Sequence, residues 1–110
     1  MTNNKSEEFK ATQQELANYS KALSHPARIA IINLIAEKKE IMTGNISDDL
    51  PIGRSTVSQH LKLLKEAGII KGTIDGLKIH YCLDMDRLNK IKKIYNQFFD
   101  SSISSFKCKC

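Results

Sequence analysis

The chain has 110 residues, of which 41% are hydrophobic, and this length and composition predict a single domain with a modest core. Seventeen Lys and Arg residues against twelve Asp and Glu give a net charge of +5, which favours an anionic partner, either nucleic acid or an acidic membrane surface. No apolar run approaches the roughly 20 residues of a membrane span and no secretory signal is visible, so we expect a cytoplasmic protein. The three cysteines are an odd number, which argues against a disulfide framework.

Two helices are predicted in the first third of the chain. Residues 6–23 carry large apolar side chains at loose helical spacing, which indicates a helix with only a partial apolar stripe. Pro26 suits the first position of a second helix that runs to about residue 38, with His25 at its N-cap. We interpret His25 as a cap and not as a metal ligand, because no ligand-type residue follows three or four positions later. Apolar residues on nearly every side of the second helix predict that it is buried centrally.

Residues 54–68 carry the strongest functional signal. Val57, Leu61 and Leu64 are spaced as one narrow stripe of a helix, and this stripe would face a core. Hydroxyl, amide, imidazole and cationic side chains crowd the other positions of the first two turns, and such groups hydrogen-bond phosphates and base edges. The candidate DNA-binding residues of this helix are Arg54, Ser55, Thr56, Ser58, Gln59, His60 and Lys62.

The preceding residues, 43–53, complete a helix-turn-helix pattern. Ile46 and Leu50 form an apolar pair on a short helix, and residues 51–53 contain the Pro and Gly that break this helix and turn the chain. A short helix, a tight turn and a longer helix with a polar leading edge are typical of a motif whose second helix enters the major groove. The same pattern also fits an ordinary helical hairpin with a solvated outer face.

After Gly68, a natural helix C-cap, the apolar period changes from 3.6 to 2. Residues 69–75 and 76–83 are predicted strands joined through Asp75-Gly76, a strong hairpin signal. Alternate side chains of the second strand, from Leu77 to Leu83, should pack inward and leave a basic side facing solvent. The candidate phosphate-binding residues of this side are Lys71, Lys78 and His80.

A last helix is predicted over residues 85–100, capped by Asp84 or Asp86 and with an aromatic-rich apolar face. The second helix and the hairpin already cover the core of so small a domain. A dimer interface therefore explains the apolar face of the last helix and the partial apolar stripe of the first helix better than the alternative, an intramolecular lid. Residues 1–100 would then form the domain, and residues 101–110 a flexible tail with two cysteines. The predicted dimer contacts are Leu16, Tyr19, Leu88, Ile91, Tyr95 and Phe98.

The order of these elements, with His-Pro-Ala-Arg at 25–28 and Ser-Thr-Val-Ser-Gln-His-Leu-Lys at 55–62, resembles the ArsR family of metal-sensing winged-helix regulators. The resemblance extends over residues 16–99. It implies a mainly α fold with a small β-hairpin, a homodimer formed through the terminal helices, and an inverted-repeat operator in double-stranded DNA. It also implies that an effector relieves repression and that Lys71, Lys78 and the Asp75-Gly76 tip serve as a wing. The residues that it implies to face the DNA groove are Ser55, Thr56, Ser58, Gln59 and His60.

Both familiar metal sites of that family look absent. Residues 42–45 contain no cysteine where many members carry a Cys-x-Cys pair, and residues 85–99 contain no histidine. The soft ligands that remain are Cys108 and Cys110, whose lysine neighbours would help to ionise them, and Cys82 in the hairpin. These three are the candidate ligands of a thiophilic metal or metalloid effector, although ordinary solvent-exposed thiols are an equal alternative at the tail. No obligatory cofactor is expected.

The leading hypothesis is therefore a homodimeric DNA-binding repressor that a thiophilic metal or metalloid releases from its operator. Two alternatives are a repressor that responds to a redox or non-metal signal, and a winged-helix protein-interaction module without DNA reading. An enzyme is not expected, because the sequence has no paired carboxylates, no nucleophile and base within one motif, and no phosphate-binding glycine loop.

Overall fold

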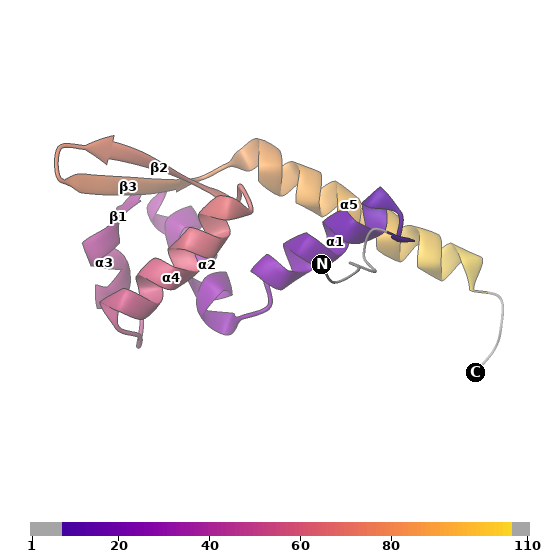
Figure 1. Cartoon of the computed structure of the whole chain (residues 1–110), viewed down its shortest axis with the longest axis horizontal. Helices are drawn as coiled ribbons and strands as arrows, with labels where there is room; N and C mark the ends of the chain where they lie inside the picture. Colours follow the sequence, from indigo (N-terminus) through magenta and orange to yellow (C-terminus); the bar gives the residue numbers. More distant parts are fainter. Residues whose placement is uncertain (1–7, 107–110) are drawn as a thin grey trace.

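The computed structural model describes residues 8–106, with the side chains of all of them except Met42 and Thr43. The elements are α1 (Ala11–Ala22), α2 (Pro26–Lys38), β1 (Ile41–Met42), α3 (Thr43–Asp48), α4 (Arg54–Glu66), β2 (Ile70–Asp75), β3 (Lys78–Leu83) and α5 (Met85–Ser105). In Figure 1, α1 and α5 lie side by side and form an arm, and the other elements form a head. The predicted fold, mainly α with a small β-hairpin in a winged helix-turn-helix arrangement, is confirmed.

The α1 helix is shorter than predicted at its start. It begins at Ala11, because the backbone N–H of Lys10 donates to the Gln13 side chain at 3.1 Å and so caps the first turn. Phe9 precedes the helix and is 58% exposed. The expectation of a helix over residues 6–23 is therefore wrong for the described residues 8–10.

The α2 helix begins as predicted but is buried on one side only. Pro26 occupies its first position, and the His25 ring nitrogen Nδ1 accepts a hydrogen bond from the Ala27 backbone N–H at 2.9 Å. Ile31 and Ile35 are fully buried, whereas Ile29 is 40% exposed. The predicted central, buried position is therefore confirmed for the face with Ile31 and Ile35, while the face with Ile29 is exposed.

A left-handed glycine ends α4. Gly68 has a φ of 76°, its N–H donates to the Lys65 carbonyl at 2.9 Å, and the N–H of Ile69 donates to the Leu64 carbonyl at 3.0 Å. These two bonds, together with the full burial of Leu64 and Ile69, define a Schellman motif. The predicted cap is confirmed, and it turns the chain directly into the hairpin.

The three strands form an antiparallel sheet in the order β1-β3-β2. Asp75 pairs with Lys78, so the two turn residues are Gly76 and Leu77. Gly76 has a φ of 63° and Leu77 has no positive φ, a combination typical of a type II′ hairpin turn. The prediction that Leu77 packs inward is wrong: it lies in the turn, fully exposed, while Tyr81 is buried.

The α5 helix is longer than predicted. Asp84 caps it, because its carboxylate accepts the Arg87 backbone N–H at 3.0 Å. The helix continues to Ser105, so residues 101–105 belong to the arm and not to a tail, and the predicted boundary after residue 100 falls within α5. Cys108 and Cys110 lie outside the described residues. None of the described helices is long and apolar enough to cross a membrane.

Two of the six predicted dimer contacts belong to the chain's own core. Tyr19 and Ile91 are buried within a single chain, because α1 packs against α5. The hydroxyl groups of Ser20 and Tyr95 form a hydrogen bond of 2.6 Å across this helix pair. The intramolecular alternative therefore applies to Tyr19 and Ile91. Leu16, Leu88 and Tyr95 are half-buried, and Phe98 is 47% exposed.

Candidate nucleic-acid interface

The first two turns of α4 present a continuous polar surface. Val57, Leu61 and Leu64 are buried as the sequence predicts, and they fix the rotation of the helix about its axis. Six of the seven candidate side chains therefore point away from the core. These exposed residues are Arg54, Ser55, Thr56, Ser58, Gln59 and Lys62.

His60 is the exception, and its expected position facing the groove is wrong. It is only 8% exposed, because it lies three residues after Val57 and next to Leu61 on the buried side of α4. Its Nδ1 lies 3.0 Å from Nη1 of Arg28, a residue that the sequence analysis did not identify as functional. His60 therefore packs α4 against the head and is not available to base edges.

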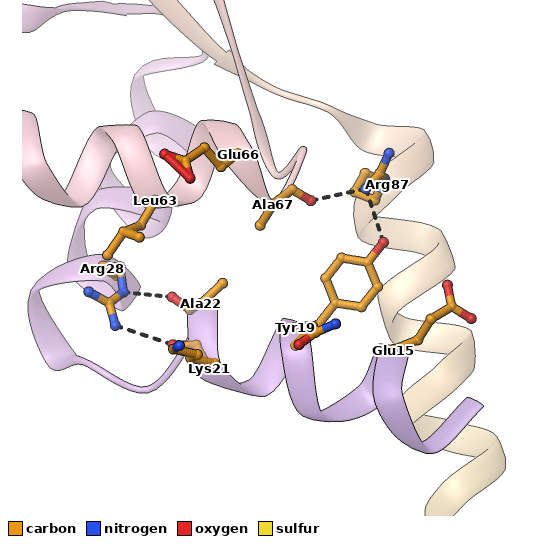
Figure 2. Close-up of a pocket in the computed structure, with 10 residues that line it drawn as sticks. Glu15, Tyr19, Lys21, Ala22, Arg28, Leu63, Glu66, Ala67 and Arg87 are labelled. Carbon is orange, nitrogen blue, oxygen red and sulfur yellow. Dashed lines mark hydrogen bonds between the residues drawn. The ribbon is translucent and has the colours of Figure 1, made fainter. Parts of the chain in front are cut away.

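Arg28 joins the end of α1 to the reading helix α4. Its Nε donates to the Ala22 carbonyl at 2.7 Å and its Nη2 donates to the Lys21 carbonyl at 3.2 Å, as Figure 2 shows. The side chain is 8% exposed. Arg28 thus supplies a donor to the Ala22 carbonyl, which the end of α1 leaves without a helical partner, and it also contacts His60. The Lys21 carbonyl accepts from Ser24 as well. The sequence signal was an arginine in the first turn of an otherwise apolar helix.

This environment disfavours the protonated form of His60. Burial lowers the pKa of His60 below its ordinary value of 6.5, and the electrostatic effect of the neighbouring His25 and Arg28 lowers it further. The rings of His25 and His60 are 4.6 Å apart between centroids. With a neutral ring, Nδ1 is free to accept the Arg28 hydrogen bond.

We expect the stability of the protein to fall as the pH is lowered below about 6.5. The unfolded chain binds a proton at His60 near its ordinary pKa, whereas the folded chain resists it. The contribution of the neutral His60 ring to the free energy of unfolding is therefore complete above the pKa that His60 has in the unfolded chain. It is lost as the pH falls through the lower pKa that His60 has in the folded chain. Urea unfolding midpoints between pH 8 and pH 5 measure this loss. A His60→Gln variant keeps a hydrogen-bond acceptor that does not titrate, so its unfolding midpoint should fall less over this pH range. Equal falls in the two proteins would contradict the assignment of the pH dependence to His60.

The β2–β3 hairpin, here called the wing, has two exposed lysines, Lys71 and Lys78. Lys71 Nζ lies 3.8 Å from the Asp84 carboxylate. His80 is different from both: its Nδ1 lies 2.7 Å from the Glu40 carboxylate, its Nε2 lies 3.8 Å from that of Asp75, and its side chain is 27% exposed. The ring is thus directed toward two carboxylates of the chain itself, and the contact of His80 with DNA phosphates stays a prediction.

Arg87 closes the joint between the arm and the head. Its Nη1 donates to the Tyr19 hydroxyl and to the Ala67 carbonyl, both at 3.0 Å (Figure 2). These bonds connect α5, α1 and the C-terminal end of α4 at the rim of a pocket. Arg28 and Arg87 therefore connect α4 to the arm at two points and fix the orientation of α4 relative to it.

Cys82 is half-buried and not on an open face of the wing. It lines a small cavity with Ile35, Lys39 and Met85, because β3 runs past the end of α2. Within residues 8–106, no group of three His, Cys, Asp or Glu side chains is placed to hold a metal ion. Cys108 and Cys110 fall outside this range, so their assignment as ligands stays a prediction.

Comparison with known proteins places the helix-turn-helix in a wide family. Residues 23–73 match the family described as a helix-turn-helix domain. The chain is 33% identical over 84 residues to an HTH-type transcriptional regulator of Methanocaldococcus jannaschii, an alignment that covers 76% of this chain and 94% of the relative. The crystal structure of the transcriptional repressor BigR from Xylella fastidiosa is 30% identical, with a TM-score of 0.63 over 89% of this chain and 97% of that one.

A further likeness concerns the fold alone. An ArsR-like transcriptional regulator from Rhodococcus sp. RHA1 is 23% identical and superposes with a TM-score of 0.73, covering 87% of this chain and 92% of that chain. Its high structural similarity at low identity is expected where buried apolar positions are kept and surface residues vary.

Proposed function

Because this chain belongs to the family of helix-turn-helix transcriptional regulators and has the fold of an ArsR-like regulator, we propose that it is an ArsR-type homodimeric repressor of an inverted-repeat operator. The family consists of DNA-binding regulators and not of enzymes. The observation that carries the proposal is the division of α4 into a buried apolar stripe and an exposed polar surface at its N-terminal end. The recognition helix of a helix-turn-helix protein contacts base edges with such a surface.

The proposed DNA contacts follow from exposure and chemistry. The amide of Gln59 suits the bidentate recognition of adenine in the major groove, and the short hydroxyl side chains suit base edges or phosphates. Lysines of the wing contact the phosphate backbone beside each half-site. The proposed contact residues are Arg54, Ser55, Thr56, Ser58, Gln59, Lys62, Lys71 and Lys78.

The proposed dimer uses the apolar surface that the arm leaves exposed. Phe98 and Phe99 are 47% and 52% exposed, and Ile103, one turn further along α5, is 71% exposed. Large apolar side chains on one exposed helix mark an association surface. The half-buried Leu16, Leu88 and Tyr95 would extend this surface toward the joint.

We expect the purified protein to sediment as a dimer and to bind a duplex selected from a random-sequence pool. Two reading helices contact two half-sites in one dimer, so the selected duplex should contain an inverted repeat. Since several lysines and arginines displace counterions, its affinity should fall steeply between 50 and 200 mM salt, by about 10³-fold or more. A monomer at micromolar concentration, or an affinity that does not respond to salt, would refute this function.

For the effector, we propose a thiophilic metal or metalloid bound by Cys108 and Cys110, with Cys82 as a third ligand. Thiolates one residue apart are soft ligands that suit such ions. Binding would release the operator only to the extent that the effector prefers the DNA-free form of the dimer. A redox or non-metal signal is the alternative.

A protein with both Cys108→Ser and Cys110→Ser should bind the selected duplex normally but should not be released by arsenite, Zn(II) or Cu(I). The substitutions remove the soft ligands without changing α4 or the wing. Fluorescence anisotropy of the labelled duplex measures the release, with the unmodified protein as control. If an ion releases both proteins equally, the sensor lies elsewhere; if none releases the unmodified protein, the redox or non-metal alternative is favoured.

A further inference from the structure

A pocket of about 400 Å³ lies where the arm meets the head. Side chains of α1, α4 and α5 line it together with Arg28 of α2, and Figure 2 shows it between the end of α1 and the last turn of α4. We call this cavity the joint pocket. Small-molecule sites have volumes of about 300 to 1,000 Å³ and are common between packed helices, so the size and position of the joint pocket suit a small ligand.

Part of the lining of the joint pocket is apolar. Tyr19, Ala22, Leu63 and Ala67 contribute this part. Leu63 is 44% exposed and, among the residues that the structure describes, lies outside the hydrophobic core. A ligand with an apolar body would remove this surface from water, which is favourable in proportion to the area that it covers.

Arg87 gives the joint pocket an anchor for an anion. A guanidinium has five N–H donors, and Nη1 of Arg87 uses its two for the Tyr19 hydroxyl and the Ala67 carbonyl. The donors on Nε and Nη2 have no acceptor among residues 8–106, and no carboxylate of these residues forms an ion pair with Arg87. Arg28 is different, because all three nitrogens of its guanidinium are engaged within the chain.

The two carboxylates at the joint pocket do not neutralise Arg87. The Glu15 carboxylate lies 3.1 Å from Nζ of Lys90 and is therefore paired with another cation. Glu66 is exposed, and Figure 2 shows it on α4, apart from Arg87, where water weakens its attraction for the guanidinium. Lys21 adds a further positive charge to the lining. The joint pocket therefore combines an available guanidinium with an apolar surface, which suits an organic anion.

We propose that the joint pocket binds a small carboxylic acid with an apolar body, and that this ligand weakens operator binding. The Nε and Nη2 donors of Arg87 lie on one edge of the guanidinium, and such an edge binds a carboxylate through two parallel hydrogen bonds. The apolar body would cover Leu63. The inference rests on the proposed DNA-binding function and is independent of the thiolate effector.

The effect on the operator follows from the second role of Arg87. The same guanidinium connects α5 to Tyr19 of α1 and to Ala67 at the end of α4. A carboxylate that pairs with it would pull the guanidinium away from these oxygens and change the orientation of α4 relative to the arm. The two α4 helices of a dimer would then no longer match the spacing of two half-sites, so the ligand favours the DNA-free form.

Isothermal titration calorimetry of the DNA-free protein with phenylacetate, 4-phenylbutyrate and 2-naphthoate tests the site. At least one of these acids should bind with a dissociation constant below about 1 mM. The neutral amide of that acid has the same shape but no charge, so it should bind at least about tenfold more weakly. Arg87→Lys keeps the positive charge but loses the planar edge, and should weaken the binding of the acid about tenfold.

Arg87→Lys also changes the joint, so a second variant is needed. Leu63→Trp fills the joint pocket without removing a hydrogen bond of the joint, and should abolish binding of the acid. Ile29→Trp is the matched control, because Ile29 is 40% exposed, close to the 44% of Leu63, and does not line this pocket. It should bind the acid like the unmodified protein, and circular dichroism checks that both variants are folded.

The same acid, at saturation, should weaken binding of the selected duplex about tenfold in fluorescence anisotropy, and saturating duplex should weaken binding of the acid by the same factor. This response should be lost in Leu63→Trp and kept in Ile29→Trp. It should also be kept in the variant with both Cys108→Ser and Cys110→Ser, which separates the joint pocket from the thiolate effector.

Any of four results would overturn the inference. They are no binding of any of the three acids at about 10 mM, equal affinity for the acid and its amide, unchanged binding by a folded Leu63→Trp protein, and an operator affinity that the bound acid does not alter. Failure of the proposed function has a different signature. In that case no duplex is selected, while calorimetry without DNA still reports whether the joint pocket binds the acid.

Discussion

Replacing Arg28 by alanine should destabilise the protein by about 3 kcal/mol and weaken operator binding, because the buried contact that holds His60 and α4 is lost. The buried guanidinium donates to the carbonyls of Ala22 and Lys21 and contacts His60. Its removal leaves the Ala22 carbonyl and Nδ1 of His60 without this buried donor, whereas the Lys21 carbonyl keeps its bonds from the Ser24 N–H and hydroxyl. Hydrogen bonds to a charged group each contribute about 1.5 to 3 kcal/mol. A loss of this size is a large part of the 5 to 15 kcal/mol typical of a small domain.

Urea unfolding followed by circular dichroism measures the stability of the Arg28→Ala variant, and anisotropy measures its DNA binding. Arg54→Ala is the matched control, because Arg54 is the same residue type but is exposed. That control should keep its stability within about 0.5 kcal/mol and weaken DNA binding alone. Equal unfolding midpoints for the two variants would show that the Arg28 contacts do not stabilise the head.

Gly68→Ala should cost about 3 kcal/mol through two separate effects. A residue with a side chain at a φ of 76° pays about 1 to 2 kcal/mol of backbone strain. In addition, the new Cβ would lie 2.7 Å from both Cζ and Nη1 of Arg87, so the guanidinium must move. This movement breaks its bonds to the Tyr19 hydroxyl and the Ala67 carbonyl, which connect the arm to α4.

Gly76→Ala separates these two effects. Gly76 also has a positive φ, 63°, but no atom lies within 4 Å of a Cβ built there. Its substitution should therefore cost only the strain, about 1 to 2 kcal/mol. Thermal or urea unfolding of both variants gives the comparison. If Gly68→Ala is no more destabilised than Gly76→Ala, the Arg87 contact contributes nothing, and the joint between the arm and the head is looser than its geometry indicates.

Residue type and short-range spacing were enough to predict the local features of this protein. The caps at His25, Gly68 and Asp84 follow from interactions within a few residues, and so were predictable from residue type and spacing. The apolar stripe of α4 likewise determined which side of that helix is exposed, because helical periodicity relates residues one turn apart. The order of the elements, and with it the winged helix-turn-helix, followed from the same patterns.

The roles of residues whose partners are distant in the chain could not be predicted in this way, because they depend on how the elements pack. His60 is buried because Arg28, 32 residues earlier, supplies a hydrogen bond, and His80 is engaged because Glu40 lies on the segment leading into β1. A polar side chain at the edge of an apolar stripe is buried only where a hydrogen-bond partner is available. The spacing of residues along the sequence does not show whether a distant residue supplies that partner. The prediction of Tyr19 as a dimer contact has the same cause. The amphipathic pattern of a helix shows that one of its faces will be buried but not which element buries it. In this protein α5 of the same chain packs against α1 and buries Tyr19.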